Sequence, residues 1–355
     1  VQLALATEDW PAFEQGLRDL RISAKRMGGG ALKMYQTLLH ALFLLRHHRT
    51  PEARRELAVG FAIVREGGMQ LPVWWRPEDL SELCAAALEA DIEPQYVQEL
   101  IRTHALEPPR KLSAPSWPWP VRLQLLGKVR AEIDGQPVSL SGRPLELLGA
   151  IVALGPDGSV AQRIAALLWP EQDEVSAAAS LKTTLSRLRK LIGHDSIVLD
   201  AGMMRLNQQR VWVDADVLES KLADERPELI AAWYGGDFLP SESASWVQRK
   251  RRRLRHRAMR LFAEGARHLS ARGEQDAAVR LWERGLDFDP TNERLYAGLI
   301  DHYVRRGQPS LAMQVYRRCA EALRQELGAQ PGPELLSLVA TANDAAHHRT
   351  ARENR

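Results

Sequence analysis

The residues best suited to bind a ligand lie in one expected helix, residues 175–192. At about 100° per residue, its apolar side chains form one stripe, and they are Leu181, Leu185, Leu188 and Ile192. The opposite face carries small, hydroxyl and basic side chains, namely Ser176, Ala179, Thr183, Ser186, Arg187 and Lys190, with Lys182 and Arg189 on one flank. Four cations without an acid suit nucleic acid, because arginine can pair bidentately with guanine and the other cations suit phosphate oxygens.

A polar, basic helix face is more often simply solvated, so the neighbouring elements decide between the two interpretations. Residues 121–127, 128–134 and 137–140 are typical of short strands, and Asp134-Gly135 between the second and third is a hairpin turn signal. Helical patterns follow at 144–154, 160–169 and 175–192, and strand patterns return at 197–199 and 205–213. This order predicts an α+β winged helix-turn-helix over residues 121–214, with DNA bound by its third helix.

The rest of the chain has helical patterns on both sides of this segment. Residues 1–106 carry apolar side chains at three- and four-residue spacing, and the proline-rich residues 107–120 are typical of a linker. Within residues 215–345, Arg272-Gly273 and Arg306-Gly307 lie 34 residues apart, as do Ala278 and Ala312, which is the tetratricopeptide period. The predicted fold is therefore mainly α, with a helical N-terminal domain, a winged helix-turn-helix and a C-terminal tetratricopeptide-like helical domain.

The net charge of +3 hides two basic segments, the third helix and residues 248–260, which hold eight lysines and arginines. For residues 248–260 three interpretations stay open: supplementary contacts to phosphates, pairing with acidic residues of a neighbouring helix, or docking of the winged helix. Tryptophans at 74, 75, 117 and 119 are more typical of packing than of ligand stacking. We expect the pair in the linker to pack against a domain.

Several function classes lack their motifs in this sequence. It contains no GxxxxGK[ST] loop, no HExxH and no GxSxG, so we expect no enzyme, no catalytic residues, no cofactor and no metal site. Two distant cysteines exclude a disulfide framework, and no apolar run is long enough to cross a membrane, which favours a cytoplasmic protein. The start at Val1 rather than methionine indicates a fragment of a longer protein.

Residues 121 to about 340 resemble the SARP-type transcriptional activators, in which an OmpR-like winged helix precedes a bacterial transcriptional activator domain of tetratricopeptide-like helices. The matching stretches are VRLQLLG…DGQPV, LLWP at 167–170, LSRLRKL at 185–191, VWVD at 211–214, GDFLP at 236–240, Trp246-Val247 and the two repeats. Residues 72–101 also resemble the helical sensor segment of larger signal-transducing ATPases that carry such activator domains. That second resemblance implies a nucleotide-binding part upstream of Val1.

The first resemblance implies double-stranded promoter DNA and RNA polymerase as partners, with two copies of the protein on direct-repeat sites. Matched to OmpR-like recognition helices, the DNA-contacting residues are Lys182, Thr183, Ser186, Arg187, Arg189 and Lys190. The family commonly has arginine and glycine near the wing turn, whereas this sequence has DAGMMR at 200–205, which leaves Arg205 as the expected contact and places the acidic Asp200 near phosphate. The alternative is a helical protein-binding scaffold whose winged helix no longer binds DNA.

Overall fold

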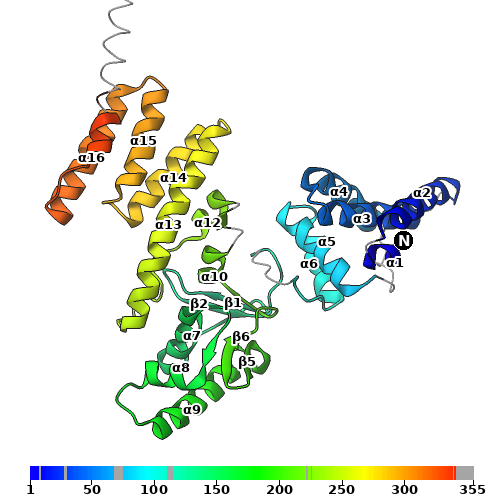
Figure 1. The fold of residues 1–355 in the computed structure, drawn as a ribbon, viewed down its shortest axis with the longest axis horizontal. Helices are drawn as coiled ribbons and strands as arrows, with labels where there is room; N and C mark the ends of the chain where they lie inside the picture. Colours follow the sequence, from blue (N-terminus) through cyan, green and yellow to red (C-terminus); the bar gives the residue numbers. More distant parts are fainter. Residues whose placement is uncertain are drawn as a thin grey trace, which may run out of the picture. The chain divides into compact units, whose positions relative to one another are not determined.

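The chain folds into two compact units in a computed structural model that describes residues 1–7, 9–27, 30–67, 75–109, 115–220, 223–224, 226–338 and 340 (Figure 1). The first unit comprises residues 1–120 with residues 207–212, and the second comprises residues 121–206 with the residues from 213 onward. The predicted fold class, mainly helical with a winged helix and tetratricopeptide-like helices, is confirmed. None of the helices in the described ranges is long and apolar enough to cross a membrane.

The first unit is an assembly of helices. They are α1 (Gln2–Ala6), α2 (Trp10–Met27), α3 (Gly30–Arg46), α4 (Thr50–Gly67), α5 (Pro77–Glu89) and α6 (Pro94–Thr103). Gly60 lets α3 and α4 approach closely, since a Cβ there would lie 2.5 Å from a methyl group of Leu38. Trp117 and Trp119 of the expected linker are buried, as predicted, whereas Trp74 lies outside the described residues.

The winged helix begins the second unit. Strands β1 (Val121–Gln124), β2 (Arg130–Ile133), β3 (Gln136–Val138) and β7 (Val211–Val213) form a sheet in the order β3-β2-β1-β7. Strands β4 (Ser159–Val160), β5 (Ile197–Asp200) and β6 (Met203–Leu206) form a second sheet in the order β4-β6-β5. Helices α7 (Gly142–Leu154), α8 (Ala161–Leu168) and α9 (Glu174–Ile192) lie between them in sequence, and the 3₁₀ turn His194–Ser196 follows α9.

Several predicted boundaries in this region differ from the structure, and two of the differences bear on the third helix and the wing. The strand expected at 205–213 is two strands, because residues 207–210 form a turn closed by the Arg210 and Val211 amides on the Asn207 carbonyl. The third helix begins at Glu174 rather than at residue 175, so it carries one acid in its first turn. Asp173 caps this helix by accepting the Ser176 amide at 2.9 Å and its hydroxyl at 2.7 Å, and these bonds lower the pKa of Asp173.

The C-terminal helices form two pairs after a short connecting region. They are α10 (Asp214–Glu219), α12 (Pro227–Trp233), α13 (Ser245–Ala271), α14 (Gln275–Phe288), α15 (Glu293–Arg305) and α16 (Pro309–Leu327). Gly273 and Gly307 occupy the same position in the α13–α14 and α15–α16 turns, both with positive φ, and Ala278 and Ala312 are both fully buried. The 34-residue repeat therefore corresponds to repeated structure.

A buried carboxylate joins the winged helix to the C-terminal helices. Asp214 begins α10 and accepts the Leu125 amide at 2.9 Å, the Leu126 amide at 3.0 Å and the Ala215 amide at 2.7 Å. Burial raises the pKa of Asp214 to about 6, and the three backbone donors act in the opposite direction. These bonds attach the start of α10 to the residues that follow β1.

The segment 235–239 packs against the same end of β1. The Gly127 amide donates to the Asp237 carbonyl at 2.8 Å, and the Leu239 amide donates to the Leu125 carbonyl at 2.9 Å. Gly127 has φ +79°, and a Cβ there would lie 2.2 Å from the Gly235 carbonyl oxygen, so glycine is required on both conformational and steric grounds.

The basic segment of α13 mostly faces this junction. Arg255 forms a bidentate ion pair with Asp237, and Arg251 donates to the carbonyls of residues 238, 239 and 242. The remaining paired cations are Lys250 and Arg253 on Glu219, and Arg257 and Arg260 on Asp224. Pairing with acids of neighbouring elements is therefore the main role of this segment.

Replacing Asp214 with asparagine is expected to destabilise the second unit by about 1–3 kcal/mol, because an amide NH₂ would face a buried backbone N–H. Urea unfolding followed by circular dichroism measures this loss. Asp157→Asn makes the same chemical change in an exposed loop and should alter stability by less than about 0.5 kcal/mol. Equal stabilities of the two variants would contradict the assigned role of Asp214.

Asp216→Asn is expected to raise stability at high pH. Burial raises the pKa of Asp216 to about 7 although Lys250 lowers it, and its Oδ1 is buried without a hydrogen-bond partner among the described residues. Because the folded-state pKa exceeds the unfolded one, the contribution of Asp216 is fully present below pH 4 and lost as pH rises through 7. Between pH 5 and pH 8, the free energy of unfolding of the variant should therefore rise relative to that of the wild type by about 1 kcal/mol or more. Urea titrations at the two pH values measure this difference.

Candidate nucleic-acid interface

Helix α9 presents one apolar and one polar face, as the sequence predicts. Its buried residues include Leu181, Leu185, Leu188 and Ile192, which are at most 7% exposed. The side chains of the opposite face are all exposed, namely Ser176, Ala179, Thr183, Ser186, Arg187 and Lys190. The apolar stripe thus fixes the rotation of α9 about its axis and turns the hydroxyl and basic side chains outward.

The candidate DNA-contacting residues fall into two groups on α9. Lys182, Ser186, Arg189 and Lys190 line one hollow, whereas Thr183 and Arg187 lie outside its lining. Arg189 is half-buried, and its Nη2 donates to the Ile197 carbonyl at 2.9 Å. It therefore attaches α9 to the wing as well as contributing charge, which the helical wheel could not predict.

The wing is the hairpin of β5 and β6, with a two-residue turn at Ala201 and Gly202. Both turn residues have positive φ, which is typical of a type I′ hairpin. Arg205 is half-buried in β6 opposite Val198, outside the lining of the hollow, and Asp200 is exposed at the turn. The structure does not bring Arg205 together with the cations of α9.

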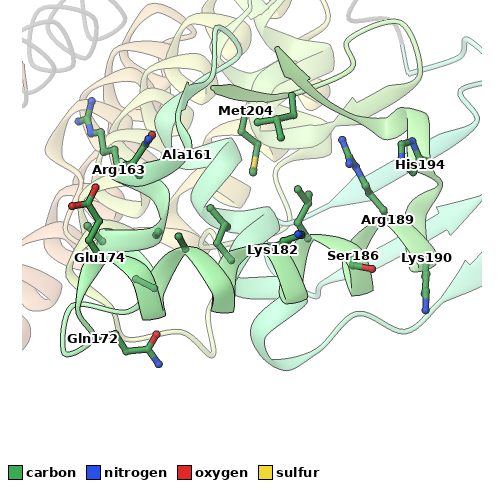
Figure 2. Close-up of a pocket in the computed structure, with 18 residues that line it drawn as sticks. Ala161, Arg163, Gln172, Glu174, Lys182, Ser186, Arg189, Lys190, His194 and Met204 are labelled. Carbon is green, nitrogen blue, oxygen red and sulfur yellow. The ribbon is translucent and has the colours of Figure 1, made fainter. Parts of the chain in front are cut away.

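The hollow lies between α8, α9 and the wing, as Figure 2 shows, and has a volume of about 1130 Å³. Met204 reaches into it from the wing and Arg189 rises from α9, whereas Lys190 points away from its centre (Figure 2). Gln162 and Arg163 of α8 and His194 after α9 also line it. The helical wheel of α9 does not include these residues. The sequence signal for them is the pair of polar and basic residues in the first turn of the second helix.

A second set of cations is exposed on α13. Arg249, Arg252 and His256 lie on one face at three- and four-residue spacing, and no ion pair links them to another described residue. The ion pairs of α13 therefore do not involve these three side chains. For them, the interpretation as supplementary phosphate contacts stays open.

Comparison with known proteins gives the class of protein that this chain resembles. Residues 220–341 match the bacterial transcriptional activator domain. Together with the relatives described next, this match confirms the predicted resemblance to transcriptional regulators of the SARP type.

Two curated relatives are both regulatory proteins AfsR. The protein from Streptomyces griseus is 27% identical over 252 residues, covering 64% of this chain, and that from Streptomyces coelicolor is 27% identical over 235 residues, covering 61%. This chain spans about a quarter of the length of these relatives. The solved structure of Mycobacterium tuberculosis EmbR in complex with a low affinity phosphopeptide has a similar fold, with a TM-score of 0.51 and 20% identity over 65% of this chain and 69% of that chain.

Arg189 and Arg187 are expected to differ in their effect on stability. Arg189→Ala removes the bond to the Ile197 carbonyl and should cost about 1 kcal/mol, whereas Arg187→Ala on the exposed face should change stability by less than about 0.5 kcal/mol. Thermal and urea unfolding of the two variants measure the difference. An equally large loss in Arg187→Ala would mean that Arg187 is a structural residue.

Proposed function

We propose that the chain binds promoter DNA in the major groove through the exposed face of α9 and activates transcription. Arg187 reads base edges, with Thr183 and Ser186 allowing close approach, and Lys182, Arg189 and Lys190 neutralise phosphates. The wing adds contacts through Arg205 in the adjacent minor groove. This function places the protein in the cytoplasm with its DNA.

The observation that carries this proposal is the outward direction of the α9 cations. Lys182, Arg187 and Lys190 are exposed and have no ion-pair partner among the described residues, while six cations of α13 are paired with acids. On a solvated face with no binding role, neighbouring acids would stabilise the helix by pairing with its cations. In α9 only Glu174 supplies such an acid. Unneutralised positive charge on one helix face suits a polyanion.

Recruitment of RNA polymerase and binding of two copies to direct repeats complete the proposal. The C-terminal helices belong to the same compact unit as the winged helix, so a partner bound to them is held at a defined place relative to the promoter. We further propose that the helices of residues 1–106 transmit an upstream signal to this unit. The competing function, a protein-binding scaffold without DNA binding, gives no reason for the unpaired cations of α9.

Arg187→Ala and Lys190→Ala are expected to separate sequence reading from phosphate binding. With duplexes enriched from a random pool, Arg187→Ala should cost about 1–3 kcal/mol at the enriched site and little on random DNA. Lys190→Ala should weaken both duplexes about equally and reduce the slope of log K against log salt by about one. Fluorescence anisotropy over a range of salt concentrations measures both effects.

Arg324→Ala is the matched control, since Arg324 is an exposed arginine on α16 and should leave DNA affinity within twofold. Unchanged affinity in both α9 variants would reject the DNA proposal and favour the scaffold.

A further inference from the structure

The hollow beside α9 has an apolar floor. Leu181, Leu185 and Met204 are almost fully buried beneath it, and Ala178 and Leu199 form part of its wall. Leu199 of the wing hairpin is 48% exposed, so it presents apolar surface to the hollow. The volume of about 1130 Å³ is slightly above the range of about 300–1,000 Å³ that is typical of small-molecule sites.

Positive charge surrounds this apolar floor. Among the side chains that line the hollow, Arg163, Lys182, Arg189 and Lys190 are cationic, and Glu174 is the one acid. The Nε of Arg189 is buried and has no hydrogen-bond partner among the described residues. Because that atom has no accessible surface on the hollow, the exposed side chains of Arg163 and Lys182 are the cations that an anion in the hollow would meet.

The two properties together define the chemistry of an occupant. A DNA backbone would use the cations, but its sugars and phosphates would bury little of the exposed apolar surface of Ala178 and Leu199. An uncharged apolar molecule would use the apolar lining and leave Arg163 and Lys182 without a counter-charge. An organic anion with an aromatic or acyl body satisfies both, with its body on the exposed apolar side chains of Ala166, Ala178 and Leu199 and its anionic group towards Arg163 and Lys182.

We propose that this hollow binds an amphipathic organic anion, and that the bound anion and DNA exclude one another. The exclusion rests on the proposed DNA binding by α9, because Lys182, Ser186 and Lys190 both line the hollow and belong to the candidate DNA-contacting set. An anion at Lys182 neutralises charge that phosphates would use. The same anion occupies the space next to Ser186, where a strand of the duplex would pass.

Titration of the full chain with 8-anilinonaphthalene-1-sulfonate, an aromatic sulfonate that fluoresces in apolar sites, tests the site. We expect saturable binding that Ala178→Trp weakens at least tenfold, because Ala178 is an exposed alanine in the wall and a tryptophan there fills the space. Ala179→Trp is the matched variant: the next residue is also exposed but lies outside the lining, so the dye should bind as in the wild type. Circular dichroism melts establish that both variants are folded.

Charge and competition are tested in the same assay. Arg163→Gln with Lys182→Gln should weaken the sulfonate several-fold and leave uncharged Nile red unaffected, and the enriched duplex should release the bound sulfonate. Equal sulfonate binding by wild type and Ala178→Trp would overturn the site, and equal loss of both dyes in the charge variant would overturn its preference for anions. Simultaneous binding of duplex and sulfonate would overturn the exclusion. Sulfonate binding that is lost in Ala178→Trp, in a protein that binds no duplex, would support the site and reject the DNA function.

Discussion

The arrangement of the second unit depends on one buried carboxylate, that of Asp214, and the backbone amides it accepts. Asp214 is 7% exposed, so water cannot replace it on the Leu125 and Leu126 amides. The segment 235–239 adds backbone bonds at the same strand end, where Gly127 leaves room for it. The winged helix and the C-terminal helices are consequently parts of one compact unit, which a flexible linker between them would not produce.

Packing of this junction also determines where positive charge is available. The cations of α13 that face the junction are paired with Glu219, Asp224 and Asp237, so most of the basic segment has a structural role. No ion pair links a cation of α9 to an acid within the described part of the chain, and Glu174 is the one acid of this helix. A net charge of +3 is therefore compatible with a concentrated positive field at α9.

The sequence predicts those parts of the fold and site that depend on local periodicity. The apolar stripe from Leu181 to Ile192 and the 34-residue repeat around Gly273 and Gly307 each lie within one segment, and both are confirmed. Strand β7 and the two-residue β4 were not predicted correctly, because each exists only through pairing with a distant strand. The bond from Arg189 to the Ile197 carbonyl and the hollow itself also require side chains from separate elements, which a helical wheel does not contain.

The hollow lies between α9 and the wing, so the spacing of these two elements matters for the candidate interface as well as its charge. The apolar stripe of α9 packs against the core. The side of the helix towards the wing therefore carries Ala178 and the edges of Leu181 and Leu185, and the small side chain of Ala178 leaves space open. Arg189 bridges that space to the wing through the Ile197 carbonyl. An occupant between Arg189 and Met204 would act on the spacing of α9 and the wing, which in the proposed complex contact neighbouring grooves of the duplex. Under the proposed function, the cavity would therefore link the shape of the proposed DNA-binding surface to the molecule that fills it.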